Sequence, residues 1–116
     1  MQIFYDNRKT QKLFNSGKAI LKNFGVAVGK RVMQRLAELD AAQSLQMVSH
    51  LPPPRCHELV SANGHVFSVD VSENMRLLFR PSGEFSNKED GGLDLASVKA
   101  VCIIEVKDTH EGKTRR

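Results

Sequence analysis

The sequence predicts an α+β fold in which two helices pack on a small, twisted and mostly antiparallel sheet. A chain of 116 residues, 41% of them hydrophobic, has the size of a single domain. In its first half, apolar residues recur at the spacing of helices, and in its second half they alternate as they do along strands. The predicted order is strand, helix, helix and three strands.

The chain begins with a predicted short strand, Gln2 to Tyr5. Asp6 or Asn7 is then expected to cap a helix through RKTQKLF, which would point Leu13 and Phe14 inward. The two glycines of the following stretch, NSGKAILKNFG, indicate a bend or a link rather than another regular element.

A second helix is predicted from Val26 to about Asp40. Its polar side would hold Arg35 among other charged residues, and its apolar side is formed by Val28, Val32, Leu36 and Leu39. The stretch AAQSLQMVSH is expected to add a loosely attached helical turn. Prolines at 52, 53 and 54 then predict an extended connector, because proline fixes its own φ angle and restricts the residue before it.

A β-hairpin is predicted for residues 66–80. Both arms alternate, and one register, in which Phe67 faces Phe79 and Asp70 faces Arg76, suits both faces. This register displays Arg76 and Arg80 on the face opposite the apolar one. Residues 82–95 are polar and rich in glycine, which predicts a long mobile loop. The run of β-branched residues at 98–106 predicts a well-buried central strand. The expected domain spans residues 1–110, and residues 111–116 form a basic C-terminal tail.

Composition narrows the function classes. A formal charge of +4 favours an anionic partner such as RNA without requiring one. Cys56 and Cys102 lie far apart and indicate neither a disulfide framework nor a zinc ribbon, so a reducing cytoplasm is the simplest location. No apolar run has the roughly 20 residues of a membrane span, and the N-terminus lacks a signal-peptide core, so no membrane association is expected.

Histidines and arginines form the candidate site. His57 leads into a strand and His110 follows the last one, and strand ends of a small sheet can meet on one rim. Imidazoles titrate near neutrality, so this pair has the chemistry of a general base and a general acid, while Arg76 and Arg80 are suited to hold a phosphate. Asp108 would orient His110 or assist proton transfer. A metal-free ribonuclease needs such a set, although a structural role for His57 and turn capping by Asp108 remain open.

Other chemistries have less support in the sequence. Zinc binding is not expected, because the adjacent pair Cys56 and His57 cannot readily supply two ligands to one ion and no metal-ligand spacing recurs. No serine lies in a nucleophile elbow, and no glycine run has the spacing of a phosphate-binding or dinucleotide-binding loop. Neither a metal nor a cofactor is therefore predicted.

Three ordered segments carry a resemblance to a known family. They are PPRCHEL, then FSVDVSENMRLLF, and the terminal IIEVKDTH. Together they resemble the HigB branch of the RelE/ParE toxin superfamily of bacterial type II toxin–antitoxin systems. In that family a His-x-Leu stretch leads to a strand with a Phe-Ser or Tyr-Ser pair, then to an Asn-x-Arg element, and the last strand ends in Asp-Tyr-His. The resemblance covers roughly residues 2–110 and implies a RelE-like β-α-α-β-β-β fold.

The resemblance implies an mRNA interferase, a metal-independent endoribonuclease that cuts mRNA in the ribosomal decoding site and so inhibits translation. It also implies a cognate antitoxin with a helix-turn-helix domain, held with the toxin in a hetero-oligomeric complex. Carried over to this chain, His57 and His110 become acid and base candidates, Asp108 a supporting carboxylate and Arg76 a phosphate contact. Arg55 and Arg80 are added as RNA contacts from the expected geometry.

Two positions depart from the family pattern. Val60 stands where family nucleases often have a lysine, and Thr109 stands where the terminal motif has tyrosine. Arg55, Lys99 or Lys107 is expected to replace the missing cation. Two alternatives follow for this fold: a non-enzymatic inhibitor of DNA gyrase, as in the ParE branch, and a degenerate toxin that only binds its antitoxin.

Overall fold

The computed structural model describes residues 1–62 and 64–108, and in these residues three α-helices and a five-stranded sheet form an α+β fold. The strands are β1 (Gln2–Tyr5), β2 (His57–Leu59), β3 (Val66–Asp70), β4 (Met75–Pro81) and β5 (Ala100–Asp108). The helices are α1 (Arg8–Phe14), α2 (Gly17–Phe24) and α3 (Val26–Ala41), with short 3-10 helices η1 (Leu45–Met47) and η2 (Leu95–Ser97). The predicted fold class is confirmed at this level.

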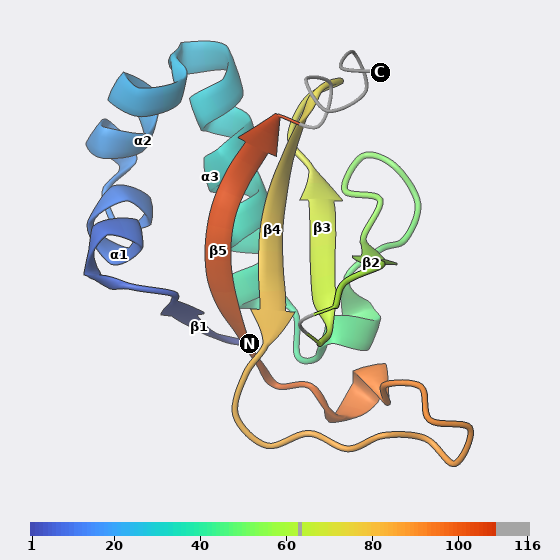
Figure 1. The fold of residues 1–116 in the computed structure, drawn as a ribbon. Helices are drawn as coiled ribbons and strands as arrows, with labels where there is room; N and C mark the ends of the chain where they lie inside the picture. The colour runs from blue at the N-terminus through green and yellow to red at the C-terminus, as the bar shows by residue number, and fades with distance from the viewer. Residues whose placement is uncertain (63, 109–116) are drawn as a thin grey trace.

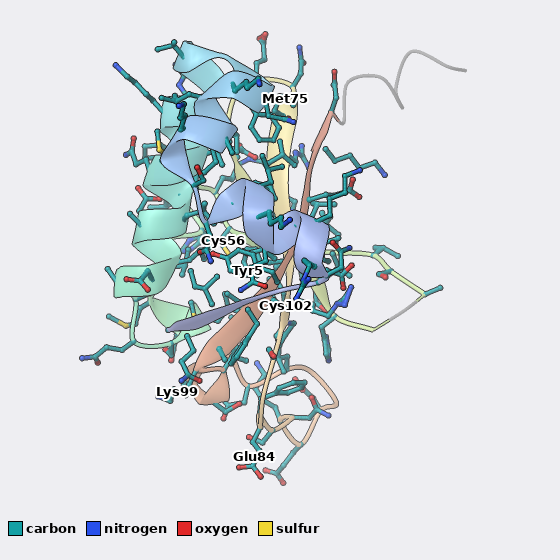
Figure 2. The ribbon with its side chains drawn as sticks, turned by 90° about the vertical axis from the view of Figure 1, so that its left-hand side faces the viewer. Tyr5, Cys56, Met75, Glu84, Lys99 and Cys102 are labelled. Atoms are coloured by element: carbon teal, nitrogen blue, oxygen red, sulfur yellow. The ribbon has the colours of Figure 1, made fainter. Side chains whose placement is uncertain are left out.

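The sheet has the strand order β1-β5-β4-β3-β2. β1 runs parallel to β5, whereas every other neighbouring pair is antiparallel, so the sheet is mixed but mostly antiparallel. In Figure 1, α3 lies behind the central strands, and α1 lies beside the edge of the sheet that β1 forms. Figure 2 shows the same layers from the side of α1, with α3 on one side of the strands.

The helix count differs from the two that the sequence predicted. Residues expected to link α1 and α3 form α2, because Ser16 caps its start by accepting a hydrogen bond from the Ala19 amide at 3.1 Å. Ile20, on the apolar side of α2, is buried in the core. Gly25 separates α2 from α3. Its φ angle of +84° is one that residues with a side chain rarely adopt.

The remaining helix predictions are largely confirmed. Asn7 caps α1 by accepting a hydrogen bond from the Thr10 amide at 2.8 Å, and Phe14 is buried. On α3, Val32 and Leu39 are fully buried, as their spacing predicted. Arg35 is the exception: we expected it on the polar side, but it is buried.

The predicted hairpin register is confirmed. β3 and β4 pair Phe67 with Phe79 and Asp70 with Arg76, and the two phenylalanine rings stack with their centroids 6.0 Å apart. The alternation places these rings on the face that the helices cover. Between β4 and β5 the register shifts at Leu78, so that one β5 residue there has no partner across the ladder.

Two connectors differ from their predictions. η1 is firmly packed instead of loosely attached: Leu45 is buried, and its amide donates to the Val98 carbonyl at 3.0 Å. The proline stretch makes a turn instead of an extended segment, since the Arg55 amide donates back to the Leu51 carbonyl at 3.0 Å. A cis peptide bond joins Pro52 to Pro53 within this turn.

The C-terminal part of the chain follows the prediction with small shifts. Residues 82–94 form a long loop with one bridge between Asn87 and Leu93, and Leu93 is anchored in the core. β5 begins and ends two residues later than predicted. Both cysteines are free thiols. Within residues 1–62 and 64–108, no helix has the length and apolar character needed to cross a membrane. Thr109, His110 and the predicted tail lie outside the described residues.

Candidate functional site

The candidate site is the sheet face opposite the helices, which we call the outer face. The strand alternation that buries Phe67 and Phe79 against the helices turns their neighbours to this face. Its residues on β2 to β5 include His57, Ser68, Asp70, Arg76, Leu78, Arg80, Cys102, Glu105 and Lys107. Four of the predicted site residues therefore share one face: His57, Arg76, Arg80 and Lys107.

Strand register arranges these side chains in rows across the sheet. The middle row consists of His57, Ser68, Leu78 and Glu105, which pair in sequence from β2 to β5. The next row, which we call the Asp70 row, consists of Asp70, Arg76 and Lys107 with Arg55 at its end. Neighbouring rows lie two residues apart along the strands, or about 7 Å. His57 is therefore within reach of a ligand held by the Asp70 row.

Asp70 is the centre of its row. Its carboxylate accepts two hydrogen bonds from Arg55, from Nε at 2.7 Å and from Nη2 at 3.0 Å. Arg76 approaches the same carboxylate, with its Nε 3.7 Å from Oδ1. The hydrogen bonds that Arg55 donates to Asp70 raise the pKa of Arg55, because they stabilise the charged guanidinium. Both arginines therefore share one acidic partner.

The turn before β2 brings Arg55 to Asp70. Arg55 has φ +45°, a left-handed conformation that costs a residue with a side chain about 1 kcal/mol. The Asp70 amide donates to the Pro54 carbonyl at 2.7 Å, which fastens this turn to the end of β3. The sequence indicated that Arg55 was a cation near the site, but its pairing with Asp70 depends on how the turn folds back.

Arg35 supports Asp70 from the helical layer. Its Nε donates to the Asp70 carbonyl oxygen at 2.6 Å, and its Nη1 lies 3.2 Å from the Glu38 carboxylate. The backbone of Asp70 is thus held at both its amide and its carbonyl. The predicted polar side of α3 placed Arg35 in solvent, and only the packing of α3 against the end of β3 buries it.

His57 occupies the edge of the middle row. It is half-buried, and its Nε2 lies 3.4 Å from the hydroxyl of Ser68, which has no exposed surface. Leu78, the next residue in the row, is also buried. On its sheet side the imidazole thus has one long polar contact, to Ser68, and an apolar neighbour, Leu78.

A cleft of about 590 Å³ opens beside His57, between η1, β2 and the 82–95 loop. Leu45, Phe67 and Leu93 contribute apolar surface, and His50 and Lys88 contribute polar groups. Residues of the 82–95 loop and His57 line this cleft together, so the loop lies next to the candidate site. Among the residues that the structure describes, no group of three or more histidines, cysteines or acidic residues is arranged to hold a metal ion.

Arg80 lies apart from the Asp70 row. It is four residues beyond Arg76 on β4, or about 13 Å along the strand. Its Nη1 pairs with Asp6 at 3.3 Å, and its partner on β5 is Cys102. Partial burial raises the pKa of the Cys102 thiol, with the Arg80 charge acting in the opposite direction. Arg80 is thus at the β1 side of the outer face.

The end of β5 carries the last predicted residues. Lys107 is exposed opposite Arg76, and Asp108 lies opposite Met75. Asp108 is therefore at the same end of the sheet as the Asp70 row. The predicted partner of Asp108, His110, lies outside the described residues. Val60, one of the two departures from the family pattern, follows β2 and is fully exposed.

Comparisons with protein-family models, with curated proteins and with solved structures find no match to this chain.

Proposed function

We propose that this protein is the toxin of a type II toxin–antitoxin system and acts as a ribosome-dependent, metal-independent mRNA endoribonuclease. The observation that carries the proposal is the placement of His57 beside the Asp70 row on the outer face of the sheet. This face presents one titratable imidazole next to guanidinium groups, which bind phosphate oxygens in fixed geometry. The ordered HigB-like segments of the sequence support the same activity.

The reaction needs a base, an acid and stabilisation of negative charge. A base removes the proton of an RNA 2′-hydroxyl, and the resulting oxygen attacks the adjacent phosphorus in line. An acid then protonates the departing 5′-oxygen, leaving a 2′,3′-cyclic phosphate. In our proposal His57 is one of the two proton-transfer groups, and His110, supported by Asp108, is the other. Arg76 stabilises charge on the phosphoryl oxygens, and Arg55, Arg80 and Lys107 contact the RNA backbone.

The lysine and tyrosine that this chain lacks must be replaced by other residues. Val60 is fully exposed and brings no charge, whereas the Asp70 row, which neighbours the row of His57, carries three cations: Arg55, Arg76 and Lys107. Lys107 stands directly across from Arg76 in that row. We propose that Lys107 and Arg55 supply the phosphate charge that a lysine at position 60 would have supplied.

Primer extension on a reporter mRNA, translated in a reconstituted system, tests the proposal. We expect the wild type to produce cuts in codon register that require the ribosome, and His57→Ala to reduce their rate at least a hundredfold. His65→Ala is the matched control. The His65 Nδ1 atom lies 2.6 Å from the Glu58 carboxylate, and this pair is away from the Asp70 row, so the loss of His65 should leave cleavage unchanged. His110→Ala and Arg76→Ala should behave like His57→Ala.

Intact mRNA with a folded wild-type protein would contradict the proposal. The same preparation would then be tested for inhibition of supercoiling by DNA gyrase, the activity of the ParE branch. If both assays are negative and the protein still binds a helix-turn-helix antitoxin, the chain is a toxin that has lost its activity. The antitoxin itself belongs to the proposal, as the partner that blocks the outer face or the route to the ribosome.

A further inference from the structure

We propose that Arg55 and Arg76 form a seat for an RNA phosphodiester and that the Asp70 carboxylate occupies this seat in the free protein. Asp70 therefore limits how tightly the outer face binds RNA. The inference rests on the proposed function for the identity of the ligand. It adds a regulating carboxylate to the site, a role that the sequence pattern did not assign to Asp70.

The geometry of the carboxylate supports this role. Two Asp70 oxygens bond two different nitrogens of the Arg55 fork, at 2.7 and 3.0 Å, which is the arrangement that two phosphate oxygens adopt on a guanidinium. Arg76 faces the same carboxylate at 3.7 Å. A phosphodiester entering between the two arginines would replace the carboxylate with a group of the same charge and the same acceptor geometry.

The two partners differ in their freedom to move. The Asp70 backbone is fixed by its hydrogen bonds to Pro54 and Arg35, and its short side chain cannot follow a ligand. Arg55 lies on a turn, and its side chain is 38% exposed, compared with 26% for Asp70. Its long stem allows the guanidinium to turn from the carboxylate toward a phosphate in solvent. The exchange thus needs movement of Arg55 and not of the sheet.

Charge sets the direction of the effect. In the free protein Asp70 offsets part of the positive charge of Arg55, Arg76 and Lys107. An anionic ligand must compete with this carboxylate for Arg55 and is repelled by it across a distance well below the Debye length of about 10 Å at 0.1 M salt. Removing the Asp70 charge should therefore strengthen RNA binding instead of weakening it.

Fluorescence anisotropy with a labelled 2′-O-methyl RNA oligonucleotide tests the inference without ribosomes and without cleavage, because this probe has no free 2′-hydroxyl. We expect Asp70→Asn to bind about tenfold tighter than the wild type at low salt, because a charge-assisted hydrogen bond becomes available to phosphate. The slope of log K against log salt concentration should become steeper by about 0.7 for each additional phosphate that the protein neutralises.

Glu105→Gln is the matched control. Glu105 lies on the same face, it loses the same charge, and it takes part in none of the ion pairs between side chains of residues 1–62 and 64–108. We expect it to strengthen binding less than threefold. In the background of Arg55→Ala, Asp70→Asn should lose most of its gain, because the guanidinium that it releases is absent. Asp70→Ser provides a second variant without the charge if the asparagine variant is poorly folded.

Equal affinities of Asp70→Asn and Glu105→Gln would overturn the inference, and so would the absence of binding in every variant. Weaker binding by Asp70→Asn would also overturn it and would mean that the carboxylate orients Arg55 for the phosphate. The proposed function fails separately. A gain in oligonucleotide binding without mRNA cleavage during translation would refute the nuclease and leave the phosphate seat standing.

Discussion

Replacing Arg35 by methionine tests how the helical layer holds the candidate site. The substitution keeps most of the apolar stem and removes the guanidinium, so the Asp70 carbonyl loses a charged donor at 2.6 Å. A hydrogen bond to a charged group contributes about 1.5–3 kcal/mol to stability, and a buried acceptor without a donor is costly. The ion pair with Glu38 adds little, because the Glu38 side chain is 36% exposed. The expected loss in the free energy of unfolding is therefore about 2 kcal/mol.

Urea denaturation followed by circular dichroism measures this loss. For a small protein, the free energy of unfolding falls by about 1–3 kcal/mol for each molar increase in urea, so the midpoint should drop by about 1 M. Arg31→Met is the control, since Arg31 is exposed on the same helix and a surface substitution usually changes stability by less than about 0.5 kcal/mol. Equal midpoints for the two variants would refute the reasoning and would mean that the contact between Arg35 and Asp70 contributes no net stability.

Three further substitutions or reactions test the fold. Phe79→Ala should destabilise the protein by about 3–5 kcal/mol, because Phe79 is fully buried and stacks on Phe67, whereas Phe85→Ala, at an exposed position, should cost far less in the same thermal or urea unfolding assay. Gly25→Ala should cost about 1–3 kcal/mol through backbone strain alone, since Gly25 has a backbone conformation that is almost restricted to glycine and nothing lies within 4 Å of the added Cβ; an unchanged urea midpoint would contradict this expectation. Burial raises the pKa of the Cys56 thiol to about 11, so at pH 8 only about 0.1% of it is thiolate, and alkylation of the native protein there should be slow and rise about tenfold per pH unit. Mass spectrometry measures the alkylation rate. Rapid alkylation of Cys56 at pH 8 in the folded protein would show that the thiol is not held in an apolar site.

Local patterns in the sequence predicted the hairpin well. Successive residues of β3 and β4 point to alternate faces, and only one register matches Phe67 with Phe79 and Asp70 with Arg76. The start of α1 was also predictable, because Asn7 satisfies an amide three residues further along the chain. These features depend on residues that are close in sequence, so the pattern of one segment at a time is sufficient to find them.

The missed helix had a local signal that competed with another. Ser16 is a good capping residue, and Ile20 follows it at helical spacing, but the glycines at both ends of the segment favoured a link. In the structure Gly25 only separates α2 from α3. Gly29 lets the two helices approach closely, since an added Cβ would lie 3.1 Å from the Leu21 Cα atom. Contact between helices, which no single segment reveals, thus decides this part of the fold.

The candidate site divides along the same line. The sequence by itself determined that Arg76 and Arg80 lie on one face of the hairpin, because alternation along a strand fixes which face a side chain takes. Only the tertiary structure decided which of these charges meet. It folds the proline turn so that Arg55 bonds Asp70, and it packs α3 so that Arg35 reaches the Asp70 carbonyl. It also separates Arg80 from this group and pairs it with Asp6. Such contacts join residues that are up to 74 positions apart, and only close packing of distant segments brings them within hydrogen-bonding distance.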